Sequence, residues 1–260
     1  MKHVPDAASD RRFEPDNTVD RVNVDGLLSE LDEYAVEQAL QIKEKRQQEE
    51  IEVAALTVGP AAAETAVRKA LQMGADQAFL VSDDAIAGSD APATSLVLAE
   101  AIKKAGGGAV PDLVICGLAS TDAGMGIIPA MLAERLGVPQ VTLASLVETE
   151  GSQVRIRRDG DTATQVIIGT MPLVLSVTDQ TGEARYPSFK NIIAAKKKPL
   201  ETWSLADLGV DASQVGLSAS WTAVEQTAAR PARTAGEIVK DEESSGALAL
   251  AGFLASKKFI

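Results

Sequence analysis

The sequence predicts an α/β fold built on a doubly wound, mostly parallel sheet. Short apolar runs alternate with helical segments between residues 30 and 137, and glycine or proline separates many of them. The runs at 113–116 and 77–81 contain almost no polar residue, as is typical of strands that helices cover on both faces. The chain has 260 residues, which is enough for a substantial hydrophobic core.

The elements follow one another in a regular order. A first helix is predicted over residues 30–45, with Ser29 as its N-cap and Asp32 three residues later. In the next helix, Glu64 and Arg68 form an i,i+4 pair, and Gly74 is suited to end it. The elements predicted after residue 45 are the strand 51–58, the helix 61–73, the strand 77–81, the helix 93–105, the strand 113–116 and the helix 125–136.

The pattern changes after Gly137, where strands follow one another without helices between them. This order is typical of an antiparallel meander or an extension of the sheet, and Asp159 and Gly160 are predicted to lie in a turn. Residues 179–198 show no regular pattern. The strands predicted in this part are 141–147, 154–158, 164–168 and 173–177.

The C-terminal part differs from the rest in its pattern. Residues 201–240 have little periodicity and are predicted to form an extended arm, and residues 246–255 are predicted to form an apolar helix that needs a covering surface. We therefore expect an α/β domain over 1–200 and a C-terminal segment over 201–260, and this segment is suited to pack on another chain.

The shortage of reactive side chains excludes several kinds of chemistry. His3 and Cys116 are the only residues of their types. One cysteine forms neither an internal disulfide nor a CxxC pair, and zinc or iron–sulfur centres need three or four Cys or His ligands. A Ser-His-Asp triad is disfavoured because the one histidine stands at position 3. We assign no metal site, and expect chemistry to use carboxylates, Lys or Arg, hydroxyls, backbone amides or a bound cofactor.

Charge and hydropathy limit the partners and the location. The formal net charge is −12 and aromatic residues make up 3% of the chain, so nucleic acid is not an expected partner. No apolar run approaches the roughly 20 residues of a membrane span. The first ten residues contain no apolar signal region. The sequence therefore predicts a cytoplasmic protein that is not inserted in a membrane.

The most informative loop covers residues 117–126, directly after an apolar strand and before a helix. Its three glycines, with Ser120, Thr121 and Asp122, suit a loop whose backbone N–H groups bind an anion such as phosphate. Val58 ends a second strand at the same edge of the predicted sheet. The alternative is an ordinary turn in which Thr121 or Asp122 caps the following helix, and the pattern alone does not exclude it.

A second loop, over residues 183–191, contains Tyr186 and Phe189 among polar residues. Exposed aromatic side chains often lie at the centre of protein interfaces, although these two could equally fold back onto the core. The nearby lysines 196–198 are interpreted as a solvated end of a helix. Cys116 is interpreted as a small buried residue, and His3 has no assigned role.

Several motifs, taken together in order, resemble the β subunit of electron transfer flavoproteins, in particular its actinobacterial members. The resemblance covers nearly the whole chain. Each motif is weak alone, but their order and spacing make the set specific. The motifs are residues 2–6, 32–39, 57–60, 68–76, 117–122, 133–140, 183–198, 207–210 and 233–236.

This resemblance implies a Rossmann-like fold of the adenine nucleotide α-hydrolase type and an electron-carrier subunit rather than an enzyme, with no catalytic residue of its own. It implies a heterodimer with an α subunit that holds most of a redox FAD, while this chain binds AMP structurally. The residues expected around AMP are Ser29, Leu31, Asp32, Val58, Gly117, Leu118, Ala119, Ser120, Thr121, Asp122, Ala123, Gly124, Met125, Gly126, Ile127 and Ile128.

The resemblance also implies contacts with other proteins. The loop 183–198 corresponds to the family's docking loop for acyl-CoA and related dehydrogenases, and Phe189 stands where a bulky side chain inserts into the partner. Tyr186 and Lys190 belong to the same loop, and Asp159 matches an acidic residue near the flavin domain of the α subunit. The implied role is electron transfer in fatty acid oxidation, from dehydrogenases to a membrane quinone oxidoreductase.

The sequence departs from the family in two places. Met1 stands where a first strand should end, so we expect one strand of the sheet to be missing from this sequence. In the nucleotide loop, Met125, Gly126 and Ile128 replace side chains that many members use, which leaves open whether a second FAD takes the place of AMP. A stand-alone adenine-nucleotide sensor of the universal-stress-protein type is the alternative function, and it accounts equally well for residues 50–137.

Overall fold

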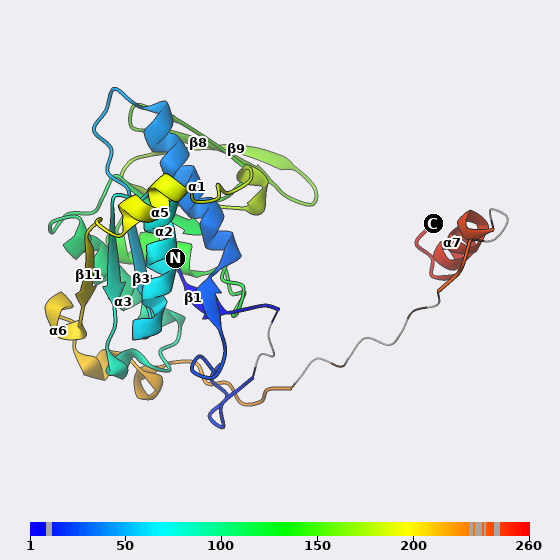
Figure 1. The fold of residues 1–260 in the computed structure, drawn as a ribbon, viewed down its shortest axis with the longest axis horizontal. Coiled ribbons are helices and arrows are strands. Elements are labelled where there is room, and N and C mark those ends of the chain that lie inside the picture. The colour runs from blue at the N-terminus through cyan, green and yellow to red at the C-terminus, as the bar shows by residue number, and fades with distance from the viewer. Residues whose placement is uncertain (9–11, 229–230, 232–235, 237, 242–244) are drawn as a thin grey trace. The chain divides into compact units, whose positions relative to one another are not determined.

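The computed structural model describes residues 1–8, 12–228, 231, 236, 238–241 and 245–260 (Figure 1). The chain divides into two units, residues 1–225 and residues 226–260. The first unit carries the sheets and most of the helices, and the second contains one described helix.

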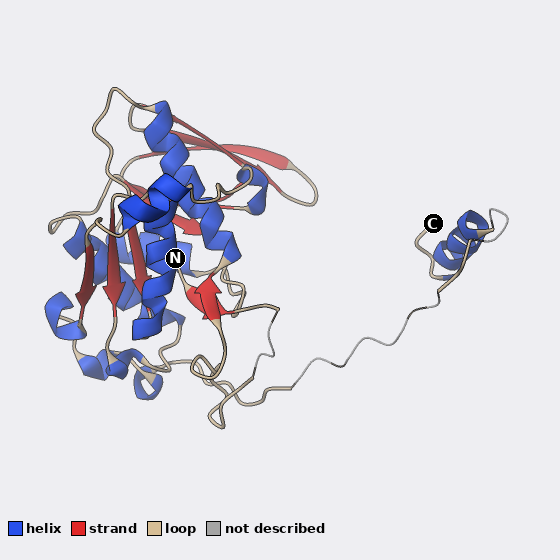
Figure 2. Ribbon diagram, in the orientation of Figure 1, coloured by secondary structure: helices blue, strands red, loops and turns tan. Residues whose placement is uncertain are grey.

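Two three-stranded parallel sheets form the centre of the first unit, which confirms the predicted α/β class (Figure 2). Their strand orders are β11-β4-β3 and β5-β10-β6. The carboxyl ends of parallel strands lie at one edge of each sheet, so the loops after β3 and β5 are placed where this fold binds ligands. The strands are β3 (Ala54–Val58), β4 (Gln77–Val81), β5 (Leu113–Gly117), β6 (Gln140–Ala144), β10 (Leu173–Val177) and β11 (Leu200–Trp203).

Helices cover both faces of these sheets. On one face, α1 packs on β5 and β10, and α2 packs on β3 and β4 (Figure 1). On the other face, α3 packs on β3, and α4 packs on β10 and β6. This arrangement is the doubly wound packing that the sequence predicts. The helices are α1 (Glu30–Lys45), α2 (Glu64–Met73), α3 (Ala91–Ala105), α4 (Ile128–Leu136), α5 (Phe189–Ala195) and α6 (Leu205–Leu208).

A three-stranded antiparallel meander leaves the parallel sheet after β6. It consists of β7 (Leu146–Glu150), β8 (Gln153–Asp159) and β9 (Thr164–Thr170), in that order. The single strand predicted over 141–147 is therefore wrong, because β6 and β7 belong to different sheets. The pairing of β6 with β10 shifts near this point, where Leu143 has a φ of 61°. Such an irregularity bends the strand and redirects the chain into the meander.

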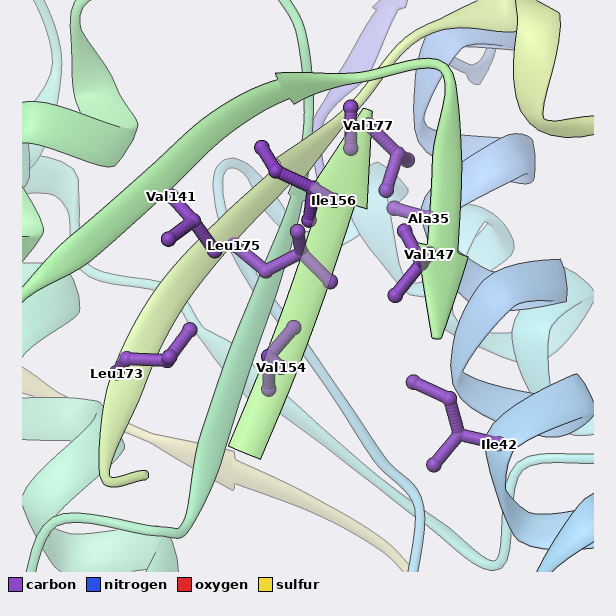
Figure 3. Packing of buried hydrophobic residues seen from close by; sticks show 10 residues of the cluster. Ala35, Ile42, Val141, Val147, Val154, Ile156, Leu173, Leu175 and Val177 are labelled. Carbon is purple, nitrogen blue, oxygen red and sulfur yellow. The ribbon is translucent and has the colours of Figure 1, made fainter. Parts of the chain in front are cut away.

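The meander packs back onto the sheet and α1 to form one hydrophobic cluster (Figure 3). Val154 and Ile156 of β8 face Leu173 and Leu175 of β10, and all four side chains are almost completely buried. Their neighbours in β8 are exposed, so the strand alternates between a core face and a solvent face. Figure 3 shows Ala35 and Ile42 of α1 closing the cluster on its other side.

A cavity of about 1880 Å³ lies against both β3 and β5. Within the described residues, β3 pairs only with β4, and β5 pairs only with β10. The Met1 ammonium donates a hydrogen bond to the Leu56 carbonyl of β3 at 3.1 Å, so the chain enters the fold beside this cavity. Two short antiparallel strands, β1 (His3–Pro5) and β2 (Gly26–Leu28), follow.

Residues 201–225 belong to the first unit, so the contacts divide the chain at 225 rather than at the expected 200. β11 adds to the sheet beside β4, and Trp203 stacks on Phe79 with ring centroids 4.4 Å apart. Asp90 accepts hydrogen bonds from the N–H groups of Trp221 and Thr222 and thereby holds the end of this segment. Trp203, Leu205, Val210 and Val215 are buried in one hydrophobic cluster with β4 and α3, so the extended arm predicted to begin at residue 201 is wrong for this segment.

The second unit contains the helix α7 (Gly246–Ser256), as the sequence predicts. It is apolar around its circumference, and Leu248, Leu250 and Phe253 are exposed. Asp241 accepts a hydrogen bond from the N–H of Gly246 at 2.8 Å, at the start of the helix. Residues 233–235 of the predicted 233–236 motif lie outside the described residues.

Candidate functional site

The loop after β5 begins at Gly117, which packs closely against the start of α1. Asp32, in the first turn of α1, is buried and accepts the N–H of Lys2 at 2.7 Å and the N–H of Gly117 at 3.3 Å. One carboxylate therefore joins the N-terminal segment, α1 and the end of β5. The capping role predicted for Asp32 is wrong, because its oxygens serve these two more distant segments.

Ser29 stands at the predicted N-cap position of α1, but its side chain has a different partner. Its side chain makes no capping hydrogen bond to α1, and its Oγ instead accepts the N–H of Thr121 at 3.3 Å. Ser29 is completely buried, so this contact fixes the middle of the loop against the start of α1. Ser29, Asp32 and the 117–126 loop were predicted to form one site, and the structure brings them together.

Asp122 lies between two cationic side chains. Its carboxylate is 2% exposed, and it accepts hydrogen bonds from the Lys2 ammonium, at 2.9 Å, and from the Arg21 guanidinium. Burial favours the neutral acid, but the charge of Lys2 and the hydrogen bonds from Lys2, Ser120 and Arg21 outweigh it and hold the pKa of Asp122 well below its usual value. Asp122 is therefore ionised, and the cluster places two cations, Lys2 and Arg21, beside two carboxylates, Asp122 and Asp32.

Several backbone N–H groups of the loop have no acceptor among the described residues. Those of Ala119, Ser120 and Gly126 donate no hydrogen bond there. Helix α4 starts only at Ile128, three residues later than predicted, and neither Thr121 nor Asp122 caps it. The predicted alternative in which Thr121 or Asp122 caps this helix is therefore wrong. Unpaired N–H groups beside the cationic side chains of Lys2 and Arg21 can bind an anion.

The cavity contains most, but not all, of the residues predicted for this site. Lys2 and Arg21 also line it, and sequence reasoning missed both because each lies far from the loop in the chain. Residues of the predicted set that stand outside the lining are Ser29, Leu31, Thr121, Asp122 and Gly124. Those within it are Asp32, Val58, Gly117, Leu118, Ala119, Ser120, Ala123, Met125, Gly126, Ile127 and Ile128.

Two reactive residue types also line the cavity. Burial raises the pKa of the Cys116 thiol to about 11, so the thiolate that reacts as a nucleophile is scarce at neutral pH. His3 is buried, and its Nδ1 has no hydrogen-bond partner within the described residues. Burial lowers the pKa of His3, which is therefore neutral at pH 7.

The aromatic loop presents its side chains to solvent. Tyr186 is 92% exposed and Phe189 is 78% exposed, so the alternative in which they fold back onto the core is wrong. Phe189 opens the helix α5, which the irregular pattern of 179–198 did not predict, and Ser188 caps this helix. Ile193 follows Phe189 by four residues and is also exposed, so it extends the apolar surface. Lys190 is exposed beside them.

The lysine run does not behave as a single solvated group. Lys196 and Lys197 are exposed as predicted. Lys198 turns inward, and its ammonium donates hydrogen bonds to the carbonyls of Leu71, Gly74 and Ala75 at the end of α2. The Lys198 ammonium thus places positive charge at the C-terminus of α2, where it interacts favourably with the helix dipole.

Asp159 lies at the end of β8 and is held within the meander. Its carboxylate accepts hydrogen bonds from Ser145 at 2.6 Å, Thr164 at 2.8 Å and Arg157 at 3.0 Å. The hydrogen bonds from Ser145 and Thr164 lower the pKa of Asp159. Its contact with a partner stays a prediction.

Two absences concern the described residues alone. Within them, no group of three or more His, Cys, Asp or Glu side chains is arranged to hold a metal ion. No helix in the described part of the chain is long and apolar enough to cross a membrane.

Residues 16–208 match the model of the electron transfer flavoprotein domain. The chain is 43% identical over 249 residues to the electron transfer flavoprotein subunit beta of Mycobacterium tuberculosis, an alignment that covers 95% of this chain and 92% of that protein. It is 31% identical over 248 residues to the corresponding subunit of Megasphaera elsdenii, covering 94% and 91% of the two chains. It is also 34% identical to Protein FixA of Azorhizobium caulinodans, covering 90% and 84%.

Proposed function

The chain belongs to the electron transfer flavoprotein family, and from this premise we propose that it is the β subunit of a heterodimer whose α subunit holds most of a redox-active FAD. The observation that carries the proposal is the similarity to subunits named beta over 95% of the chain. The bound flavin supplies the electron chemistry, and this chain acts as a carrier subunit without catalytic residues of its own.

We propose that the loop after β5 binds the phosphate of AMP. The unpaired N–H groups of Ala119, Ser120 and Gly126 offer donors, and Lys2 and Arg21 add positive charge beside them. Val58 and Met125 line the same cavity and offer apolar contacts for an adenine ring. The role of AMP is structural, because Cys116 and His3, the only thiol and imidazole of the chain, are poorly suited to attack or protonate a ligand at pH 7.

Residues 183–198 form the proposed docking loop, defined here by its exposed Tyr186, Phe189 and Ile193. A dehydrogenase that oxidises an acyl-CoA binds this apolar surface and delivers electrons to the flavin, and a membrane quinone oxidoreductase receives them. Such a route serves fatty acid oxidation in the cytoplasm. Lys190 and Asp159 contribute polar contacts to partner chains.

The second unit is proposed to pack on the α subunit. An exposed helix that is apolar all round is seldom stable alone in water, and Leu248, Leu250 and Phe253 gain most from cover by another protein. We assign the exposed part of residues 201–260 to the interface with the α subunit. Asp159 is proposed to lie beside the flavin domain of that subunit.

Co-expression with a candidate α subunit tests the heterodimer and the ligand together. We expect the two chains to co-purify with a flavin absorption spectrum, and mass spectrometry after denaturation to find FAD and AMP at about one per heterodimer. Two FAD molecules and no AMP would show that a flavin occupies the loop. A colourless, stable chain that binds no α subunit would contradict the carrier function.

Replacement of Phe189 tests the docking loop. Removal of a central apolar side chain from an interface often costs 2 kcal/mol or more, so Phe189→Ala should lower kcat/KM for electron transfer from the dehydrogenase by about thirtyfold. The control is Phe13→Ala, at an exposed phenylalanine outside the loop. Equal rates for the Phe189→Ala variant and the unaltered heterodimer would refute this docking role.

A further inference from the structure

Arg185 connects the start of the docking loop to α1. Its Nε donates a hydrogen bond to Glu37 at 2.6 Å, and its Nη2 donates to the other oxygen of Glu37 at 3.0 Å. Its Nη1 and Nη2 also donate to the two oxygens of Glu44, at 2.5 and 2.9 Å. The backbone N–H of Arg185 adds a hydrogen bond to Glu37 at 3.2 Å. One residue of the loop is thus held by two carboxylates of one helix.

The positions of Glu37 and Glu44 on α1 determine how the Arg185 side chain lies on the helix. Glu37 and Glu44 are seven residues apart, so they lie on one face of the helix, about 10 Å apart along its axis. The side chain of Glu37 is 9% exposed and also accepts a hydrogen bond from Gln41, while Glu44 is more than half exposed. The Arg185 guanidinium must lie along this face to bridge both carboxylates. The backbone at Arg185 is therefore held in one orientation relative to α1.

Both carboxylates are ionised at neutral pH. Burial disfavours the charged form of Glu37, but hydrogen bonds from Arg185 and Gln41 outweigh it and lower the pKa. The hydrogen bond from Arg185 lowers the pKa of Glu44, and the two glutamates raise the pKa of Arg185 further. The contact therefore persists across the neutral range, and its strength comes from charge-assisted hydrogen bonds.

The other end of the loop is held independently. Ala195, at the end of α5, is buried against α2, and Lys198 donates hydrogen bonds to three carbonyls at the end of α2. Between Arg185 and Ala195, the large apolar side chains point to solvent and contribute little to holding the loop. The first half of the loop, with Tyr186 directly after Arg185, thus depends on α1.

We propose that Arg185 is a positioning residue for electron-donor recognition, which holds the docking loop in the conformation that presents Tyr186 and Phe189 to the dehydrogenase. This inference rests on the proposed function of the loop. A loop already ordered before binding loses less conformational entropy when the partner docks, so the same contacts give a tighter complex. Arg185 acts on docking and not on the flavin.

Arginine is required here by geometry. Its planar guanidinium uses three nitrogens to donate to two carboxylates at once, whereas a lysine ammonium is a single point of charge. Arg185→Lys should keep one ion pair and lose the bridge, and so should restore only part of the function. Arg185→Gln removes the charge and leaves Glu37 buried without its cation.

The experiment measures steady-state electron transfer from a purified acyl-CoA dehydrogenase to the complete flavin-loaded heterodimer. We expect Arg185→Gln to raise the KM for the heterodimer about tenfold with kcat changed less than twofold, and Arg185→Lys to fall between Arg185→Gln and the unaltered protein. Hydrogen exchange of the Asn191 and Ile192 amides, which donate hydrogen bonds to Ser188 at the start of α5, should accelerate in Arg185→Gln. Flavin reduction by dithionite should proceed at the same rate in all variants.

Arg155→Gln is the matched control, because Arg155 is an exposed arginine paired to Glu148 in the meander. It should leave KM and exchange in the loop unchanged. If Arg185→Gln lowers thermal stability but leaves KM and loop exchange unchanged, the residue is only structural and the inference is overturned. A fall in kcat with constant KM would overturn it as well.

A double-mutant cycle with Phe189→Ala separates this inference from the proposed function. If docking through Phe189 is correct, Phe189→Ala alone raises KM, and adding Arg185→Gln raises it little further because both act on one contact. Full additivity of the two effects would overturn the positioning role. If Phe189→Ala has no effect at all, the proposed function of the loop fails, whatever Arg185→Gln does.

Discussion

Gly117→Ala should disturb the loop after β5, the proposed nucleotide site, through a steric clash with the start of α1. A Cβ at position 117 would lie 2.6 Å from the carbonyl oxygen and 2.8 Å from the carbonyl carbon of Leu31, and 2.9 Å from Asp32 Oδ1. Non-bonded carbon and oxygen atoms keep a separation of about 3.3 Å or more, so a displacement of about 0.5–1 Å is needed. Two of the three atoms belong to the backbone of α1, which cannot rotate away as a side chain can.

The energetic cost follows from two contributions. Inserting a methyl group into close-packed surroundings costs about 1–3 kcal/mol. The same displacement weakens the hydrogen bond from the Gly117 N–H to Asp32, which is 3.3 Å long, and a hydrogen bond to a charged group contributes about 1.5–3 kcal/mol. We expect a loss of about 2–4 kcal/mol in the free energy of unfolding, and a fall in Tm of about 5–15 °C for a chain of this size. The φ of Gly117 lies outside the left-handed region, so backbone strain adds nothing.

The assay compares bound nucleotide with stability in the purified heterodimer. Gly117→Ala should reduce the nucleotide released on denaturation at least tenfold, because the loop shifts relative to Lys2. Gly137→Ala is the control: φ is +66° and no atom lies near its Cβ, so it should cost about 1 kcal/mol through strain alone and keep its nucleotide. An unchanged Tm with full nucleotide content in Gly117→Ala would refute the reasoning.

Three further outcomes can be measured. Lys198→Met should lower the free energy of unfolding by about 1.5–3 kcal/mol, because it leaves three carbonyls at the end of α2 without their donor. The control, Lys197→Met, should change it by less than about 0.5 kcal/mol. Urea titrations measure both values. The pKa of Asp122 is lower in the folded protein than in the unfolded chain. The stability that the ionised Asp122 contributes is therefore complete above about pH 4–5 and decreases as the pH falls below that range. Asp122→Asn should make the free energy of unfolding depend less on pH between about pH 6 and 3. Ile156→Ala, on the core face of β8, should lower the free energy of unfolding by about 2–5 kcal/mol. Ile168→Ala, on the exposed face of β9, should lower it by less than about 1 kcal/mol. Chemical denaturation of both variants measures the two losses.

Elements with a local signal in the sequence were predicted well. The helix at Glu30–Lys45 and the strand at Gln77–Val81 have the bounds that were expected. Their apolar spacing and their flanking glycine or polar residues are properties of consecutive residues, so no tertiary contact is needed to recognise them. The sequence did not predict α5, because Phe189 and Ile193 are exposed and the segment therefore lacks the usual pattern of a helix with a buried apolar face. Its packing on α2 is seen only in the structure.

The candidate site was predicted in part. The position of the 117–126 loop follows from a strand, a glycine and a helix in succession, and this order is visible in the sequence. The partners of its side chains are not, because the segments around Lys2, Arg21 and Asp32 meet only when the chain folds. Ser29 does stand at the predicted N-cap position, but the side chains of Ser29 and Asp32 do not cap α1, because they accept hydrogen bonds from residues 92 and 85 positions away.

The α/β class, the position of the loop after β5 and the family resemblance all follow from the amino-acid sequence, because each depends on the order and spacing of neighbouring residues. The pairing of charged side chains becomes visible only in the folded chain. Lys2 and Arg21 pair with Asp122, Arg185 bridges Glu37 and Glu44, and Lys198 donates to the end of α2. Hydrogen bonds and ion pairs act over a few ångströms in space, and separation along the chain does not predict that distance until the sheets and helices are packed.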